Sequence, residues 1–273
     1  MKHSEYPRLI LLMLPVAIVF LAFFLLPMAR LILIGGSGEN GFSEYLSIFH
    51  TPRHFESLVS TVLLSAAVTI AAVIISAVTG VFLERNRFPG REVLISMLTF
   101  PLAFPGVVIG FLVIMLAGRQ GLANEISQAL TGSRLVFAYS MAGLFTGYLY
   151  FSIPRVILTI MAAAEKLDPA LEEAARSLGA SRWQVIRDVI LPALKPALIA
   201  SGAIAFATAM GAFGTAFTLA TNIDVLPMTI YTEFTLNANF ATAAALSIVL
   251  GTITWLALYI SRSIAGSTVA AAA

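Results

Sequence analysis

Six long apolar stretches, almost free of charge, dominate this chain of 273 residues. They are Leu9 to Ala29, Leu58 to Leu83, Val93 to Gly118, Leu135 to Ala164, Ala197 to Ile223, and a stretch within Phe234 to Ser261 that we expect to start near Phe240. About 20 mainly apolar residues let a helix cross the roughly 30 Å hydrocarbon core of a bilayer. Barrel strands would instead alternate in pieces of about 10 residues. The pattern therefore predicts an all-α integral membrane protein with six transmembrane helices.

The composition excludes several other classes of protein. Apolar residues make up 59% of the chain and charged residues 11%, whereas a soluble domain has about 25% charged residues. A net charge of +2 is too small to indicate a nucleic-acid partner. Because cysteine is absent, the chain has no disulfide framework, no thiolate nucleophile and no cysteine-based metal site.

The positions of lysine and arginine predict the orientation of the six helices. One set of helix ends carries ten of these residues: Lys2, Arg8, Arg85, Arg87, Arg91, Lys166, Arg176, Arg182, Arg187 and Arg262. The other set carries only three, which are Arg53, Arg119 and Arg134. Since positive loops remain in the cytoplasm, we expect both termini to be cytoplasmic.

The loop at 165–192, on the positive side, has the signals of two short helices. Asp168 and Pro169 suit the start of a helix that Gly179 would end in a left-handed conformation. Ser181 with Gln184 forms a capping box for a second helix, and prolines at 192 and 196 are expected to mark the beginning of the fifth span. The apolar positions at helical spacing are Leu167, Leu171, Ala174, Ala175 and Leu178, then Trp183, Ile186 and Val189. Such an amphipathic helix–turn–helix either enters a groove on another protein or rests on lipid headgroups.

The same loop carries a specific motif. Glu173-Ala174-Ala175 is followed after three residues by Gly179, and after nine more by Val189, Leu191 and Pro192. This spacing resembles the EAA loop of permease subunits of ABC importers, with Val189 in place of isoleucine. The similarity extends over about residues 55–262 and includes the inner loop at 85–90 and the TFPLAFPGVVIG stretch. The chain resembles the binding-protein-dependent permeases of the polyamine, sulfate, iron and phosphonate group.

The resemblance implies a transport mechanism and a set of partners. The short helix at 169–178 would be a coupling helix that docks on a cytoplasmic ABC ATPase. The residues it would use are Leu171, Glu173, Ala174, Ala175, Leu178, Gly179 and Arg182. The expected partners are two ATPase subunits, a second permease subunit of the same or a related sequence, an extracytoplasmic substrate-binding protein and membrane lipid, with no nucleic acid. ATP and Mg²⁺ would bind to the ATPases. The chain has no phosphate-binding loop of its own, and we predict no enzymatic activity, no cofactor and no metal site.

The chain is expected to form one transmembrane permease domain over residues 1–273 in the bacterial inner membrane. Its core would span about 55–262, with an additional N-terminal helix at about 9–34 and the coupling loop at 165–192. The substrate is left open among a polyamine, a phosphonate, another oxyanion and iron.

Several residues inside the predicted spans are candidates for the solute pathway. These are Pro105, Gly106, Arg155, Gly211, Phe213, Gly214, Thr215 and Asn222. Interrupted membrane helices occur at transporter sites, but the same prolines and glycines also serve close helix packing. Gly106 with Gly110, and Gly143 with Gly147, have the small-xxx-small spacing of such packing. Arg155 either binds an anionic solute or extends its charge toward the membrane surface.

Two alternatives to the importer remain at this point. A secondary transporter or channel working alone would need ion-coupling carboxylates within the membrane, and a membrane enzyme would need catalytic side chains there; the predicted spans supply neither. His50 and His54, four residues apart, either share a helix face as two metal ligands or are two loop histidines.

Overall fold

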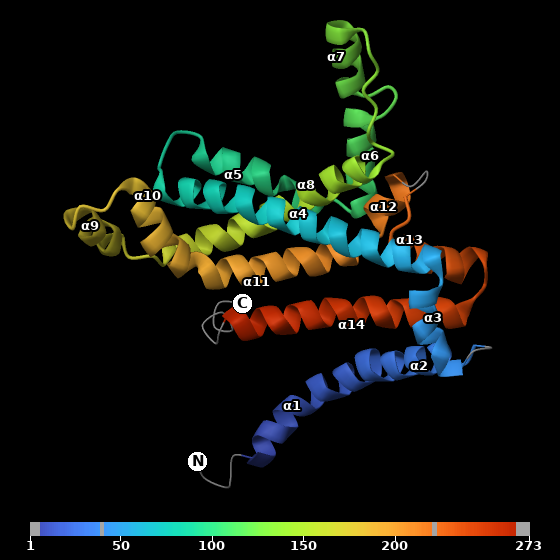
Figure 1. Ribbon diagram of the computed structural model, residues 1–273. Coiled ribbons are helices and arrows are strands. Elements are labelled where there is room, and N and C mark those ends of the chain that lie inside the picture. Colours follow the sequence, from blue (N-terminus) through green and yellow to red (C-terminus); the bar gives the residue numbers. More distant parts are fainter. Residues whose placement is uncertain (1–5, 39–40, 220–222, 266–273) are drawn as a thin grey trace. The chain divides into compact units, whose positions relative to one another are not determined.

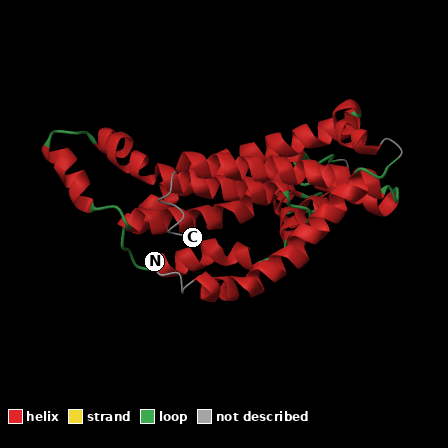
Figure 2. Ribbon diagram, turned by 90° about the horizontal axis from the view of Figure 1, so that it is seen from below, coloured by secondary structure: helices red, strands yellow, loops and turns green. Residues whose placement is uncertain are grey.

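The computed structural model describes residues 6–38, 41–219 and 223–265, and all regular elements in these ranges are helical (Figure 2). Within this described part, six helical segments are long and apolar enough to cross a membrane. They are Leu11–Gly35, Pro52–Arg85, Gly106–Thr131, Met141–Glu165, Arg182–Met210 and Phe240–Ala265. The predicted all-α class and the number of spans are confirmed.

The chain divides into two compact units, of which the smaller comprises residues 1–55 and 229–251. Its described elements are α1 (Tyr6–Phe20), the π-helical turn η1 (Leu21–Leu25), α2 (Leu26–Gly35), the 3₁₀ turn η2 (Gly41–Ser43), α3 (Glu44–His50), the π-helical turn η5 (Thr232–Leu236) and the first half of α14 (Phe240–Ala265). The Thr242 hydroxyl donates to the Glu44 carboxylate at 2.6 Å, which ties α14 to α3. The Tyr45 hydroxyl donates to the Ile32 carbonyl at 2.8 Å and ties α3 to α2.

The two histidines fall in this smaller unit and lie in different helices. His50 is the last residue of α3, whereas His54 belongs to α4, which begins at Pro52. The shared helix face that the metal alternative required is therefore not formed. His54 is buried, and its Nε2 lies 3.5 Å from the Glu233 carboxylate. The described residues contain no group of three or more potential metal ligands.

The larger unit comprises residues 56–228 and 252–273. Its described elements are α4 (Pro52–Arg85), α5 (Arg91–Thr99), the 3₁₀ turn η3 (Phe100–Ala103), α6 (Gly106–Ala117), α7 (Leu122–Thr131), α8 (Met141–Glu165), α9 (Pro169–Ser177), α10 (Arg182–Val185), the π-helical turn η4 (Ile186–Ile190), α11 (Leu191–Met210), α12 (Gly214–Leu219), α13 (Leu226–Tyr231) and the second half of α14. Helices α4, α8 and α11 run alongside one another and α5 lies beside α8, with α9 and α10 at one end and α6, α7 and α12 at the other (Figure 1).

Helix α8 lies at the centre of the larger unit. It contacts α5, α6, α11, α12 and η3. Its fully buried side chains include Leu144, Tyr148, Val156 and Ile160. The two apolar clusters of the unit both include residues of α8, one together with α6 and α12 and the other together with α11. The position of α8 is therefore coupled to that of almost every other element in the unit.

The third predicted span, at 93–118, is interrupted where its two prolines fall. Helix α5 ends at Thr99, and the chain becomes extended at Phe104 and Pro105 before α6 begins at Gly106. Each proline removes a backbone donor and disfavours helical geometry in the preceding residue, so Pro101 and Pro105 break the helix, as their positions in the sequence indicate. The predicted bounds of this span were wrong. The candidate span instead comprises α6 and α7.

The fifth predicted span, at 197–223, also has different bounds. Helix α11 is continuous through η4 with α10, so the span begins at Arg182 and ends at Met210, where the chain leaves the helix before α12. Pro192 therefore lies within a continuous helical path and does not mark the boundary. The π-helical turn η4 ends two residues before Pro192, just as η1 ends two residues before Pro27. Proline has no N–H group, and its ring clashes with the carbonyl one turn earlier. A wider turn before the proline gives room for the ring and keeps the helix continuous.

Glycines allow α6, α8 and α12 to approach closely, as the small-xxx-small spacing predicted. A Cβ atom at Gly110 would lie 2.5 Å from Thr218 Cβ, and one at Gly147 would lie 2.8 Å from Thr215 Cγ2. One at Gly214 would lie 3.0 Å from the Val107 nitrogen. Side-chain atoms of Thr218 and Thr215 and the backbone of Val107 occupy the space that a larger residue would need.

We predict that Gly110→Ala lowers the apparent melting temperature of the purified protein in detergent, because the new methyl group must displace Thr218 at a cost of about 1–3 kcal/mol. Gly251→Ala is the matched control, since its Cβ would meet nothing within 4 Å. Equal melting temperatures for the two variants would show that α6 and α12 are not packed as described.

Candidate functional site

The predicted helix–turn–helix forms as α9 and α10, and each cap is the one the sequence indicated. The Asp168 carboxylate accepts a hydrogen bond from the Ala170 backbone N–H at 2.9 Å. Gly179 takes a left-handed φ of +87°, and the Ala180 N–H reaches back to the Ala175 carbonyl at 3.1 Å, which closes the end of α9. The Ser181–Gln184 capping box starts α10.

Apolar side chains project from this helix–turn–helix. Leu178 is 90% exposed and Trp183 is 67% exposed, and Leu171 is also exposed. Glu173, Ala174 and Arg182 lie at the surface as well, and Ala175 is half-buried. We call this set the α9–α10 surface; it consists of Leu171, Glu173, Ala174, Leu178, Arg182 and Trp183. It presents apolar side chains beside one acidic and one basic group.

The two adjacent glutamates of α9 have different surroundings. Glu172 Oε1 lies 2.5 Å from Arg85 Nη2, which belongs to the last turn of α4. The two groups form an ion pair, but their angles do not meet the geometry of a hydrogen bond. Arg176 adds a second, longer ion pair to Glu172 at 3.7 Å. Glu173 is exposed and forms no ion pair among the described residues. Glu172 therefore anchors α9 to α4, while the carboxylate of Glu173 remains accessible.

The end of α4 is itself braced. Arg91 is buried and donates from Nε to the Leu83 carbonyl at 2.6 Å. Its two Nη atoms contact Glu84 at 3.2 Å and Glu92 at 2.5 Å. Arginine thus caps a helix end that would otherwise leave carbonyl groups without partners. These contacts hold the last turn of α4, which carries Arg85, in place.

A cavity of about 280 Å³ lies where the interrupted helices of the larger unit meet. Its lining residues are Pro101, Leu102, Phe104, Gly106, Ile109, Phe151, Arg155, Thr208, Gly211, Ala212, Gly214 and Thr215. The walls come from η3 and α6, from α8, from α11, and from the break that leads into α12. The Thr215 hydroxyl donates to the Gly106 carbonyl at 2.9 Å and fixes two of these walls to each other.

Arg155 carries the only charge among the residues described in this lining. Its Nη1 donates to Thr208 Oγ1 at 2.8 Å, across from α8 to α11. No carboxylate of the described residues lies within ion-pair distance of its guanidinium. An ionised side chain within a membrane span is costly and usually marks a functional site.

The structure places the predicted pathway residues in three groups. Gly106, Arg155, Gly211, Gly214 and Thr215 line the cavity. Pro105 caps α6 and Phe213 precedes α12, and neither belongs to the lining. Asn222 lies outside the described residues.

The cavity also has lining residues that were not predicted from the sequence, among them Thr208 and Phe151. Phe151 lies one helical turn before Arg155, and Thr208 lies three residues before Gly211, so helical spacing offered a signal for both.

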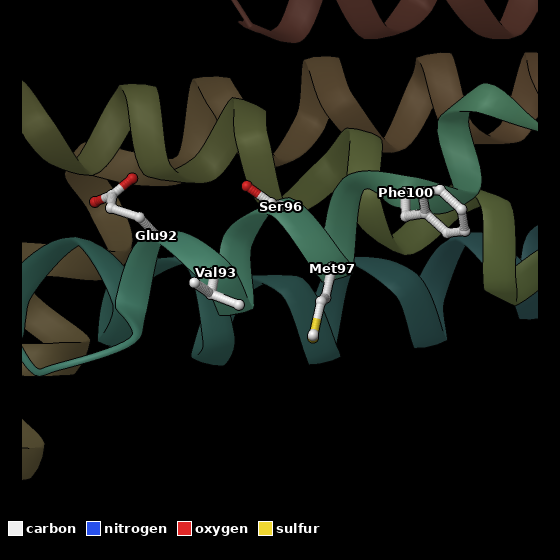
Figure 3. A pocket seen from close by; sticks show the side chains of 5 residues that line it. All are labelled: Glu92, Val93, Ser96, Met97 and Phe100. Atoms are coloured by element: carbon white, nitrogen blue, oxygen red, sulfur yellow. The ribbon is translucent and has the colours of Figure 1, made fainter.

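A second, larger pocket of about 550 Å³ lies over α5 and is drawn in Figure 3. Its lining residues are Glu92, Val93, Ser96, Met97 and Phe100, all from one helix and the residue after it. Glu92, its charged residue, is already paired with Arg91. Volume alone does not make a site, and the smaller cavity beside Arg155 has the polar groups that a solute would need.

Residues 72–266 match the family described as "Binding-protein-dependent transport system inner membrane component". The chain belongs to this family. It is therefore a permease component of an ABC importer and a multi-pass protein of the inner membrane, as the EAA-like spacing predicted. The family consists of transport components rather than enzymes.

Relatives with known names agree with this assignment. The chain is 35% identical over 212 residues to the molybdenum transport system permease protein ModB of Escherichia coli K12, covering 75% of this chain and 92% of ModB. It is 31% identical over 199 residues to the sulfate transport system permease protein CysT of the same organism, covering 73% and 70% of the two chains. It is 28% identical over 219 residues to the putative 2-aminoethylphosphonate transport system permease protein PhnU of Salmonella typhi, covering 79% and 76%.

Solved structures share the fold. A chain of a bacterial ABC transporter involved in the import of the acidic polysaccharide alginate superposes with a TM-score of 0.77 at 19% identity, covering 96% of both chains. A chain of the MetNI methionine ABC transporter in an inward-facing conformation superposes with a TM-score of 0.60 at 18% identity, covering 79% of this chain and 95% of that chain.

We predict that Glu172→Gln loosens α9 and that Glu173→Gln does not. The side chains of Arg85 and Glu172 are only 26% and 15% exposed, so losing this ion pair costs more than the ~1 kcal/mol of a surface pair, and local opening of α9 should rise by about fivefold or more. Limited trypsin digestion measures this opening as the rate of cleavage at Arg176 and Arg182. Equal cleavage rates in both variants would mean that the contact with Arg85 does not hold the helix.

Proposed function

We propose that the α9–α10 surface is the coupling element through which a cytoplasmic ABC ATPase drives this permease. The observation that carries the proposal is a capped, anchored helix–turn–helix whose apolar side chains, above all Leu178, project outward. Exposed apolar side chains at helical spacing fit a groove on a partner protein. Glu173 supplies a polar contact beside them, and Ala174 and Ala175 allow close approach.

The proposal includes the assembly around this chain. Two ATPase subunits bind ATP and Mg²⁺ and contact two α9–α10 surfaces, so a second permease subunit, identical or related, completes the pathway. A substrate-binding protein delivers solute on the opposite face of the membrane. Both termini then lie in the cytoplasm, on the side where lysine and arginine predominate. Residues 1–273 act as one permease domain in this arrangement.

We further propose that the solute is a small oxyanion and that the cavity beside Arg155 belongs to its pathway. Three similar permeases are named for molybdenum, sulfate and 2-aminoethylphosphonate transport. Among its described lining residues, the cavity has one positive charge, that of Arg155, and no carboxylate. Of the substrates that the sequence left open, polyamines and iron cations lack a counter-charge here.

The test is recovery of the ATPase with the tagged permease after co-expression of the importer and solubilisation in detergent. We expect wild type to retain the ATPase, and Gly179→Ala and Leu178→Asp to lose most of it. The first change strains a left-handed residue by about 1–2 kcal/mol and reorients the end of α9. The second places a charge in the apolar contact.

Gly132→Ala is the matched control for Gly179→Ala. Gly132 is also left-handed, with φ +69°, and in neither glycine would a Cβ meet an atom within 4 Å. The two changes therefore impose similar strain at different places. If Gly179→Ala and Leu178→Asp retain the ATPase as well as Gly132→Ala does, the coupling role of the α9–α10 surface is wrong.

A further inference from the structure

Within the proposed pathway, we infer that Arg155, held by Thr208, is a binding site for a tetrahedral oxyanion inside the permease itself. This inference rests on the proposed function and adds a site at which the solute would stop after leaving the binding protein. Three features carry it: the way the guanidinium is held, the charge of the surrounding wall, and the depth of the site.

The guanidinium is fixed by a neutral partner. Thr208 Oγ1 donates its own hydrogen to the Ile204 carbonyl at 2.7 Å, so toward Arg155 it can only accept. The hydrogen bond from Nη1 orients the planar group without neutralising its charge. Arginine has five N–H donors, and a fixed guanidinium binds an oxyanion through two parallel hydrogen bonds. The described residues supply no other acceptor for its side chain, so these donors can serve a solute.

The other residues that line the cavity around Arg155 are uncharged, and the volume of the cavity is close to that of a small-molecule site. Gly106, Gly211 and Gly214 expose backbone rather than side chains to the cavity. Its volume of about 280 Å³ is near the lower end of the range of small-molecule pockets. Helix α6 also begins at Gly106 on this wall without a side-chain cap, so its N-terminal partial charge adds to that of Arg155. A monovalent or divalent anion is favoured here, and a polyamine is not.

The depth of the site argues against the simplest other ligand. Arg155 lies ten residues before the last residue of α8, or about 15 Å along the helix. The Arg155 side chain is exposed, and a lipid phosphate at that end of α8 would have to reach over this length of helix. The distance favours a solute in the pathway over a lipid headgroup as the anion that meets Arg155.

The experiment measures equilibrium binding of radiolabelled sulfate and of molybdate to the permease–ATPase complex in nanodiscs, without the substrate-binding protein. Wild type should bind both anions and should not bind putrescine, which serves as the cationic probe. Arg155→Met should weaken anion binding by about tenfold or more, since a charge-assisted contact is lost. Arg155→Lys should retain part of the affinity, because it keeps the charge but loses the paired geometry.

Thr208 provides a matched pair of variants. Thr208→Ser keeps the accepting hydroxyl and should bind anions like wild type, whereas Thr208→Val keeps the shape, loses the acceptor and should bind several-fold more weakly. Arg134→Met removes an exposed arginine away from the cavity and should leave binding unchanged. The melting temperature and the amount of ATPase recovered are measured on each preparation, so that misfolded variants are recognised.

Two outcomes would contradict the proposed anion site. In the first, wild type recovers the ATPase but binds no anion. In the second, Arg155→Met binds anions as tightly as wild type does. Either result leaves the proposed coupling function intact. Loss of the ATPase from wild-type complexes would instead contradict the proposed function, so the two failures are distinguishable.

Discussion

Backbone hydrogen bonding in a bilayer is the constraint on which the rest of this structure depends. No water reaches the hydrocarbon to satisfy a free N–H or C=O group, so a spanning chain must be helical except where protein surrounds it. The chain leaves helical geometry at Phe104–Pro105 and again after Met210. Both breaks border one cavity, where hydroxyl groups of neighbouring helices donate to carbonyls beside the breaks: Thr215 to Gly106 and Tyr148 to Ala212.

The two candidate sites are joined by the chain itself. Helix α8 carries Arg155 and leads through three residues into α9, while α10 runs without interruption into α11, which carries Thr208. A displacement of α9–α10 therefore moves the two helices whose hydrogen bond holds the guanidinium. The ion pair between Glu172 and Arg85 brings α4 into the same motion. In the proposed importer, this is how an event at the ATPase would reach an anion inside the membrane.

Much of the structure followed from local signals in the sequence. Apolar runs predicted six spans, and Asp168, Gly179 and the Ser181 capping box predicted α9 and α10, because caps depend on residues only a few positions apart. The predicted beginning of the fifth span was wrong, because the π-helical turn before Pro192 lets the helix continue through this proline. No pattern of residues in the sequence predicted that turn. The contact between Arg155 and Thr208 joins residues 53 positions apart, and only packing of α8 on α11 creates it.

The most direct test of the account uses the absence of cysteine from the chain. A Leu178→Cys variant carries one thiol at the tip of the α9–α10 surface, and a membrane-impermeant maleimide reports its accessibility in inside-out vesicles. We expect rapid labelling of the permease without its ATPase and strong protection when the ATPase is bound, with no labelling from the outer face. Equal labelling with and without the ATPase, or labelling from the outer face, would contradict the claim that this surface couples ATP hydrolysis to transport.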